Sequence, residues 1–491
     1  MHKQTKVILK ASDFKNYFNS PFSLYCDYNV DPRYKDASFS PYIEIVLRKG
    51  EEFHEFVVSE VIEPGEKIER YPFTPEGFLQ ALVAMSKGKE HLFEVPLFYY
   101  PNGLHGRADY IQKEKGKSIF GKYYYSIVET KNSKTLKDEH KLQAFVYNHI
   151  IGKIQGYTPE TVGIKLNNGL TTLEVDYDEE KLFAELDAIR DIVKGVKIPS
   201  ATFGMSDRWR SYADKIAIQN RDISLINGIR VGRKKKCLAG GLDSLEKIAN
   251  CSEGKLSQIL GPFAPSRSVL NYAKAIYENK VIIIRKLPRF SNNCSEIYLD
   301  FEGGLSSDQV KFPFLIGFMA KKKERFDYNS IFSTKRDPDC VTDNFLKFVS
   351  KIQRFKKPLR IYHWGNYEVS SLLDMCTICD VDFNDVFSNN LEDLCKIFKD
   401  CFSLPVYRYS IKDVSSFFGY NWKYSQEEIN GQIAVNIYQK ILENPDESKH
   451  LVKKLLDYNK DDCNALLFLK GVLSRDEYPK ESNHQASLFD Y

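Results

Sequence analysis

The sequence lacks the long apolar run that a membrane span requires. No stretch of the 491 residues reaches about 20 consecutive apolar positions, and residues 1–6 show no apolar segment typical of a secretory signal. We therefore expect a cytoplasmic protein. The formal net charge is only +4 although 28% of the residues are charged, so any strongly basic surface has to be local. The length is sufficient for two or three domains with large cores.

Cysteine is present without the spacing of a disulfide framework. Ten cysteines are scattered along the chain, which is typical of buried thiols in a reducing compartment. Cys376 and Cys379 lie in an apolar helical stretch, and the next pair, Cys395 and Cys401, is widely spaced. We therefore predict no zinc site.

Internal repeats and low-complexity blocks are also absent, and the composition predicts four parts. We expect an α/β domain over residues 1–204, which closes with a helix near Asp178–Lys194, and a basic helical connector over 205–285. A second α/β domain is expected over 292–475, followed by a polar tail over 476–491.

One stretch of the first domain combines carboxylates with a lysine. Tyr123–Val128 is aromatic and β-branched and predicts a strand, and the period of two places Glu129 and Lys131 on one face of it. Asp109 ends a shorter run, which we expect on the neighbouring strand across a hairpin at Lys113–Lys117. Two such carboxylates suit Mg²⁺ or Mn²⁺, and the lysine would orient a water or stabilise a charged transition state.

This pattern, Asp109 followed by Glu129-Thr130-Lys131, resembles the PD-(D/E)xK nucleases and in particular their RecB-like branch. Gln143 and Tyr147 are four residues apart on one face of an expected helix and resemble the QxxxY signature of that branch. The early segment Gly50–Glu55 resembles a helix whose histidine, here His54, reaches the metal. The resemblance implies a restriction-endonuclease-like fold, with Asp109, Glu129 and His54 at the metal and Lys131, Gln143 and Tyr147 in the catalytic site.

Many RecB-like nucleases also carry an iron–sulfur cluster held by four cysteines. The first of these cysteines belongs to a Cys-Pro pair, and this chain has Ser20-Pro21 at that place. Cys26 is displaced, and Cys237 and Cys251 lack the close spacing of the others. We predict no iron–sulfur cluster.

The second α/β domain contains another acidic set. Ser295–Gly304 predicts a strand that ends in glycines, with Asp300 and Glu302 on one face. Near the end of the domain, a helix predicted from Leu455 to about Leu473 places Tyr458 and Asp462 one turn apart.

Asp-x-Glu on a first strand with Tyr-x-x-x-Asp on a late helix resembles the DEDDy 3′→5′ exonucleases, which have the ribonuclease H-like fold. The resemblance implies that Asp300, Glu302 and Asp462 bind two metal ions and that Tyr458 orients the attacking water. The strand predicted at Leu359–Trp364 precedes Glu368, which stands where the family has aspartate. Glu368 is our fourth ligand, with Asp393 in reserve.

The connector resembles the first half of a helix-hairpin-helix element over Leu242–Leu256, with a further helix near Ser266–Tyr277. Such hairpins present backbone N–H groups to a DNA phosphate. The hairpin here is Gly261-Pro262-Phe263, and Pro262 has no N–H. A basic run, Arg230 with Arg233–Lys236, either tracks a nucleic-acid backbone or forms a solvated face.

The last seven residues contain Gln485, Leu488, Phe489 and Tyr491, an arrangement that resembles the motif by which proteins bind the PCNA-type sliding clamp. The apolar side chains would fill a pocket of the clamp and Gln485 would bond at its edge. The alternative is a tail that docks on its own domain.

Taken together, these resemblances imply a Mg²⁺- or Mn²⁺-dependent nuclease with two phosphodiester-hydrolysing sites, acting on single-stranded DNA or DNA ends in repair or replication maintenance. Two alternatives stay open. In the first alternative, the chain is a nuclease whose substrate is RNA. In the second, it is a clamp-tethered nucleic-acid-binding scaffold in which one or both sites are inactive.

Overall fold

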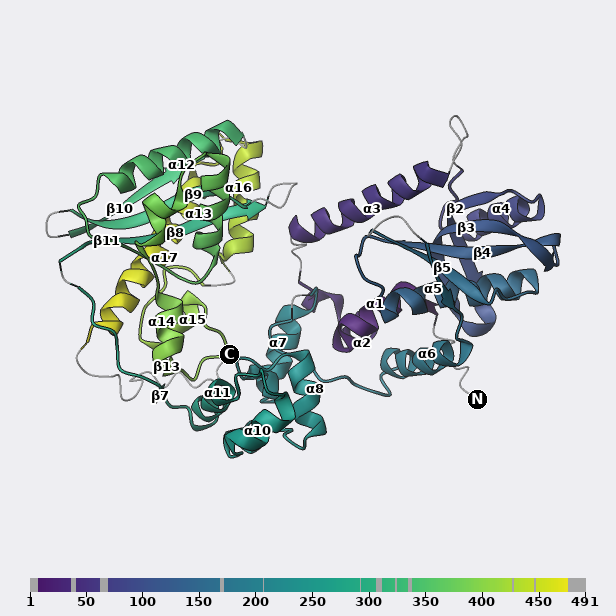
Figure 1. The fold of residues 1–491 in the computed structure, drawn as a ribbon, viewed down its shortest axis with the longest axis horizontal. Helices are drawn as coiled ribbons and strands as arrows, with labels where there is room; N and C mark the ends of the chain where they lie inside the picture. Colours follow the sequence, from purple (N-terminus) through teal and green to yellow (C-terminus); the bar gives the residue numbers. More distant parts are fainter. Residues whose placement is uncertain are drawn as a thin grey trace. The chain divides into compact units, whose positions relative to one another are not determined.

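The computed structural model describes residues 8–36, 41–61, 69–167, 172–205, 207–291, 293–305, 311–322, 325–333, 338–425, 428–445 and 447–475. The chain forms two compact units, Met1–Ile216 and Ala217–Tyr491. Both are mixed α/β structures, and each is described by itself (Figure 1). None of the described helices is both long enough and apolar enough to cross a membrane.

The first unit contains a six-stranded sheet in the order β1-β3-β4-β5-β6, with β2 also paired to β3. β1 pairs with the start of β3 and β4 with its far half, while β2 pairs along the opposite edge. The β4–β5 pair is parallel, and β5–β6 is antiparallel. The strands are β1 (Leu9–Lys10), β2 (His91–Tyr99), β3 (Leu104–Ser118), β4 (Gly121–Lys131), β5 (Thr161–Leu166) and β6 (Thr172–Asp176).

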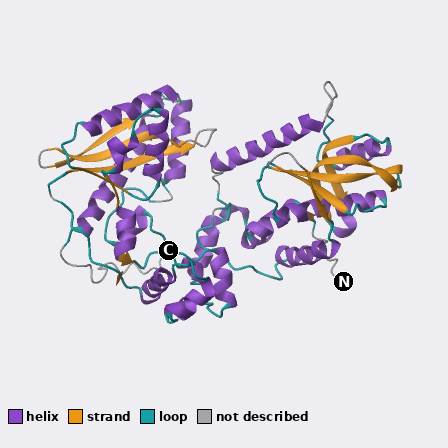
Figure 2. Ribbon diagram, viewed as in Figure 1, coloured by secondary structure: helices purple, strands orange, loops and turns teal. Residues whose placement is uncertain are grey.

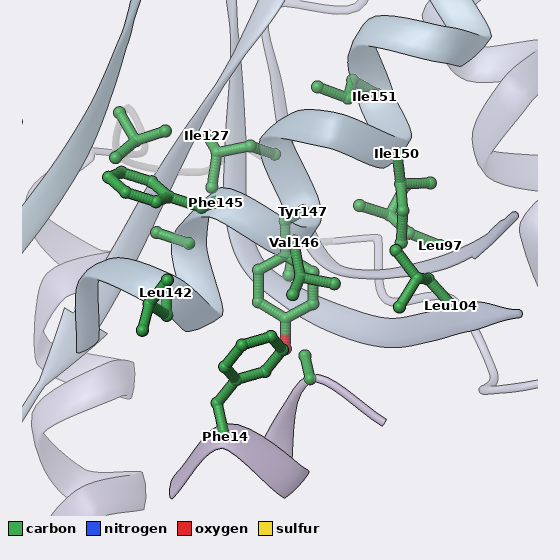
Figure 3. Close-up of a cluster of buried hydrophobic side chains, with 14 of the residues drawn as sticks. Phe14, Leu97, Leu104, Ile127, Leu142, Phe145, Val146, Tyr147, Ile150 and Ile151 are labelled. Atoms are coloured by element: carbon green, nitrogen blue, oxygen red, sulfur yellow. The ribbon is translucent and has the colours of Figure 1, made fainter. Parts of the chain in front are cut away.

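Seven helices accompany this sheet among the described residues, and the long helix α5 packs on β3 and β4. Its apolar side chains join those of the strands in one core, where Figure 3 shows Tyr147 among Phe14, Leu104 and Val146. The helices are α1 (Ser12–Asn19), α2 (Pro21–Asn29), α3 (Pro41–Val61), α4 (Pro75–Ser86), α5 (Asp138–Gln155), α6 (Glu179–Val193) and α7 (Arg210–Gln219), of which α7 runs across the boundary between the units.

The predicted hairpin between the Asp109 and Glu129 strands is present as β3 and β4, but its turn does not lie at Lys113–Lys117. These residues continue β3, and the chain turns at Ile119–Phe120. The strand persists because its charged residues pair with a tyrosine run on β4, with Lys115 opposite Tyr123. Gly116 leaves room for the Tyr124 ring, since a Cβ there would lie 2.6 Å from it.

The second unit begins with short helices that precede its sheet. They are α8 (Val231–Ala239), α9 (Leu245–Ala249), α10 (Glu253–Leu260) and α11 (Ser266–Glu278), and α11 packs on α9 and α10. A small two-stranded sheet, β7 (Ile282–Ile283) with β13 (Phe402–Ser403), joins the end of this segment to the rest of the unit.

The main sheet of the second unit has the order β10-β9-β8-β11-β12. The first three strands form antiparallel neighbours, while β11 and β12 run parallel to β8. The strands are β8 (Ser295–Leu305), β9 (Lys311–Lys322), β10 (Arg325–Phe332), β11 (Leu359–His363) and β12 (Leu391–Asp393).

Helices cover both faces of this sheet (Figure 2). Ile297, Leu299 and Phe301 of β8 enter one core cluster with α12 and α13, whereas Tyr298 enters another with α14 and α17. The helices are α12 (Pro338–Gln353), α13 (Tyr367–Ile378), α14 (Leu394–Cys401), α15 (Ile411–Phe417), α16 (Gly431–Glu443) and α17 (Lys449–Leu473). α17 begins six residues before the predicted start at Leu455.

Candidate active sites

The second unit brings three carboxylates together between β8 and α17. The period of two places Asp300 and Glu302 on the α17 side of the sheet, the side of Tyr298. Asp462 projects toward them from α17, and ligand oxygens of the three side chains all lie within 4.8 Å of one another. In the described part of the chain, this is the one group of three or more acidic, histidine or cysteine side chains close enough to share a cation.

Glu302 and Asp462 are buried, Asp300 is half-buried, and the three carboxylates repel one another. Burial, and after it the charges of Asp462, Glu302 and Glu368, raises the pKa of Asp300 well above its usual value. Burial and the charges of Asp462 and Glu368 also raise the pKa of Glu302 well above its usual value. Burial also raises the pKa of Asp462 to about 7, against the opposing charge of Lys412. An all-oxygen donor set that is costly to ionise without a cation fits Mg²⁺ or Mn²⁺.

Tyr458 and Lys412 lie beside Asp462. The Tyr458 hydroxyl bonds to the Asp462 carboxylate, which favours the ionised form of that carboxylate. The ammonium group of Lys412, a buried residue, lies 4.9 Å from the centre of the Tyr458 ring and donates to the Ile429 carbonyl at 3.0 Å. Nothing in the sequence indicated this contact, because a lysine in a short helix carries no local sign of burial.

Asn459, also missed, holds Asp300 in place. Its Nδ2 donates to Asp300 Oδ2 at 2.7 Å, and its Oδ1 accepts from the Tyr328 hydroxyl at 2.7 Å. Close approach of α17 to β9 requires glycine at position 317, since a Cβ there would lie 1.5 Å from Asn459 Oδ1. A glycine inside an apolar strand is the sequence signal that could have indicated this contact.

Glu368 lies in the first turn of α13, is buried, and raises the pKa of both Asp300 and Glu302 by its charge. Its Oε2 is 4.0 Å from His363 Nδ1. The reserve residue, Asp393, accepts from the backbone N–H groups of Lys396 and Gly365, and so caps α14. Its Oδ1 is thereby occupied, which favours Glu368 over Asp393 as the fourth acidic residue.

In the first unit, Asp109 and Glu129 lie where β3 and β4 part. Their last paired residues are Tyr110 and Val128. Beyond this pair, side chains replace the ladder: Glu129 Oε1 accepts from the Asp109 N–H at 3.2 Å, and Asp109 Oδ2 accepts from the Thr130 N–H at 2.9 Å. This exchange fixes both carboxylates at the opening between the strands.

Lys131 closes this group. Its Nζ donates to Glu129 Oε2 at 2.6 Å and lies 3.7 Å from Asp109 Oδ2. Burial and Asp109 raise the pKa of Glu129 to about 8, although Lys131 opposes the shift. Burial would also raise the pKa of Asp109, but the charge of Lys131 and the Thr130 bonds hold it below its usual value.

His54 and the QxxxY pair occupy different places around this group. His54 Nδ1 lies 3.2 Å from Thr130 Oγ1, whose hydroxyl donates to Asp109 Oδ2 at 2.9 Å. Gln143 Nε2 donates to the Tyr147 hydroxyl at 3.2 Å. Tyr147 is buried in the core below β3, where a Cβ at Gly106 would lie 2.5 Å from its ring, so its position supports the strand that carries Asp109.

Glu94 is a further acidic residue at this site that the sequence did not indicate. It stands opposite Asp109 in the β2–β3 register, between the pairs Phe93–Tyr110 and Val95–Ala108, and its φ is +50°. A non-glycine residue in this region is strained, and such strain is concentrated at functional sites. Glu94 Oε1 lies 3.9 Å from His54 Nε2.

The basic run of the connector bonds largely within its own unit. Lys234 is buried and pairs with Asp222 at 2.7 Å, Arg233 donates to the Gly228 carbonyl, and Lys236 donates to the Leu260 carbonyl. At the hairpin, Gly261 has φ +100° and Phe263 is fully exposed. The clamp-like motif at Gln485–Tyr491 lies outside the described residues.

Comparison with known families supports part of this picture. A family model described as the RNase_H superfamily matches residues 297–474, the region that contains the Asp300 cluster. No curated protein matches the chain. The C-terminal region is thus a ribonuclease H-like domain, a fold that usually belongs to nucleases and other phosphodiester hydrolases that use divalent metals. The acidic cluster of this chain lies within that domain.

Proposed function

We propose that this chain is a metal-dependent DNA nuclease with two sites, of which the ribonuclease H-like site is a 3′→5′ exonuclease. The close group formed by Asp300, Glu302 and Asp462 is the observation that carries this proposal. With Glu368, these residues would hold Mg²⁺ or Mn²⁺, which when bound supplies Lewis-acid stabilisation of the phosphoryl oxygens. Tyr458, fixed by Asp462, would orient the attacking water.

The first unit would hydrolyse phosphodiesters through its PD-(D/E)xK-like group. Asp109 and Glu129 would bind the metal, and Lys131 would orient a water and stabilise the developing charge. Ligand atoms of His54, the third expected ligand, and the two carboxylates do not all lie within 4.8 Å of one another, so His54 would have to approach them when the metal binds. The reciprocal bonds between Asp109 and the Glu129-Thr130 segment support this assignment, because they hold two carboxylates and a lysine together at one strand opening. Gln143 and Tyr147 would act as positioning residues beneath that opening.

Cleavage of 5′-labelled single- and double-stranded DNA in Mn²⁺ tests both sites. Wild type, Asp109→Ala and Asp300→Ala are compared on a sequencing gel, with matched RNA strands in parallel. A ladder that shrinks from the 3′ end and disappears only in Asp300→Ala, with other cuts lost only in Asp109→Ala, would support two independent nucleases. Cleavage of RNA alone would change the substrate, and no cleavage with either metal would favour the nucleic-acid-binding scaffold.

The tail would anchor the nuclease to a sliding clamp through Gln485, Leu488, Phe489 and Tyr491, which would suit a role in DNA repair or replication maintenance. Deletion of residues 485–491 should abolish clamp binding in a pull-down and leave cleavage of naked DNA unchanged. Clamp binding that persists after the deletion would exclude the tail as the anchor.

A further inference from the structure

One face of the first sheet carries exposed aromatic rings beside an arginine. Leu97 and Leu104 point into the main core, so the period of two places Phe98 of β2 and His105 and Arg107 of β3 on the opposite face. Phe98 pairs with His105 across the two strands. This face therefore presents rings and a guanidinium away from the core.

Three rings on this face form what we call the aromatic strip: Phe73, Phe98 and Tyr100. Phe73 stacks on Phe98 with ring centroids 5.2 Å apart, and Tyr100 stacks on Phe98 at 6.4 Å. Phe73 is 39% exposed and Tyr100 is 63% exposed. None of the three belongs to the main core cluster, although the half-buried Phe98 packs edge-to-face on Phe78 of α4, which lies against that core. Phe73 and Tyr100 therefore extend the aromatic contact from the edge of the core to the solvent.

The strip is connected to the Asp109 site through charged side chains. The Arg107 guanidinium lies 5.5 Å from the centre of the Phe73 ring, and its Nη1 is 3.3 Å from Glu94 Oε2. Glu94 stands opposite Asp109 in the register of β2 and β3. Arg70 also reaches Glu94, with its Nε 3.5 Å from Oε1, so one carboxylate holds two half-exposed arginines beside the site.

Stacked, solvent-facing rings with flanking arginines suit an unpaired nucleic-acid strand. Every base has a π-face that can stack on an aromatic side chain, and arginine adds both a phosphate contact and a cation–π contact. The bases of a duplex are stacked inside the helix and cannot reach such rings. The strip ends beside Arg107 and Glu94, so a strand that stacks on its rings would lie next to the Asp109 site.

We propose that the aromatic strip binds unpaired nucleobases and leads a single strand to Asp109. This inference rests on the proposed function of the first site and adds the residues that select its substrate. DNA and RNA both carry the bases and phosphates that the strip would recognise. The experiments below therefore compare DNA strands with RNA strands.

The first test measures binding by the full-length chain in EDTA, so that no cleavage occurs. Fluorescence anisotropy is recorded with DNA and RNA single strands and with a blunt DNA duplex, for wild type, Phe73→Ala and Tyr100→Ala. Each substitution should weaken single-strand binding by about five- to 150-fold, the usual loss of one stacked base, and leave duplex binding unchanged. Tyr34→Ala, which removes a similarly exposed tyrosine (57%) near α2, should have no effect.

The second test locates the strand, because the ribonuclease H-like domain can also bind nucleic acid and mask a loss in the first unit. Single strands that contain 5-iodouracil are irradiated with the wild-type chain, and the cross-linked peptides are identified by mass spectrometry. Cross-links in the first unit should fall on Phe73, Phe98 or Tyr100. Cross-links in that unit that fall only elsewhere, or unchanged single-strand binding with unchanged cross-linking in Phe73→Ala and Tyr100→Ala, would overturn the proposal. Binding at the strip without cleavage in Mn²⁺ would refute the nuclease activity of the first site and not the strip.

Discussion

At the scale of single residues, the buried Glu129 carboxylate makes the stability of the first unit depend on pH. Its pKa is raised to about 8 by burial and by Asp109. A carboxyl group with a raised folded pKa keeps a proton that the unfolded chain releases, so stability falls as the pH rises from the ordinary value near 4.5 toward 8. We expect the chelated protein to lose thermal stability across this range.

Glu129→Gln should reduce that loss, because the amide cannot release a proton. Differential scanning calorimetry in EDTA, over buffers from about pH 5 to about pH 8, measures the slope of Tm against pH for both proteins. Other carboxyls with a raised pKa, such as Asp462, keep the slope of Tm against pH negative in the variant, though shallower than in wild type. An identical slope in the two proteins would show that Glu129 is ionised throughout.

Tyr458 offers a sharper test of the second site, since its ring and its hydroxyl have separate surroundings. The ring packs against the Lys412 ammonium, while the hydroxyl bonds to Asp462. Tyr458→Phe keeps the ring, so Mn²⁺ affinity should change by less than about threefold while 3′ trimming slows by at least about tenfold. Tyr420→Phe is the matched control: its hydroxyl bonds to Asp461, and its trimming rate should stay near wild type. Equal rates for the two variants would remove Tyr458 from the reaction.

At the scale of secondary-structure elements, the contact between β9 and α17 sets the position of Asp300. Gly317→Ala would place a Cβ 1.5 Å from Asn459 Oδ1, and overpacking of this kind costs about 1–3 kcal/mol. The displaced Asn459 would also release Asp300, so Mn²⁺ affinity at this site should fall with stability. Gly471→Ala is the control, because that glycine lies on α17 with nothing within 4 Å of the added Cβ.

Urea denaturation measures the free energy of unfolding of the two glycine variants, and Mn²⁺ titration measures their metal affinity. Comparing the variants shows whether the close contact at Gly317 matters more than an added methyl group elsewhere. Gly471→Ala should be neutral or up to about 1 kcal/mol more stable, because alanine favours a helix. Wild-type stability and Mn²⁺ affinity in Gly317→Ala would show that the contact between Asn459 and β9 neither stabilises the fold nor positions Asp300.

The elements themselves show which features a sequence can predict. Alternation and β-branched runs are local, so the strands at Tyr123–Val128 and Ser295–Gly304 appear where they were predicted, as β4 and β8. The charged second half of β3 was misread as a turn, because its tyrosine partners on β4 lie across the sheet and not beside it in sequence. The fit of Gly317 to Asn459 and the positive φ of Glu94 likewise depend on contacts between distant segments.

The acidic residues show the same difference between local patterns, which a sequence can predict, and contacts between distant segments, which it cannot. The predicted pair Asp300 and Glu302 needs only the period of a strand, and Asp462 joins it in the structure as the late-helix pattern predicts. The choice between Glu368 and Asp393 could not be made from spacing, because it depends on which carboxylate caps α14 and which lies buried beside the others. The roles of all these residues in catalysis remain predictions that the experiments above address.

At the scale of the whole molecule, Asp109 and Asp300 belong to different compact units with separate apolar cores. Substitutions at independent sites change the free energy of unfolding additively, to within about 0.5 kcal/mol. We therefore expect wild type to bind Mn²⁺ in two independent classes of site. Asp109→Ala should lose one class, Asp300→Ala the other, and the double variant both.

Isothermal titration calorimetry with Mn²⁺ measures this directly, and two further variants identify the ligands of the second class. Glu368→Gln should weaken the class that Asp300→Ala removes, because its buried carboxylate acts on Asp300 and Glu302. Asp393→Asn should keep both classes, since an asparagine can still cap α14 through its oxygen. If Asp109→Ala changed the affinity of the class that Asp300→Ala removes, the two units would be energetically linked, and neither site could be assigned a rate from the other variant alone.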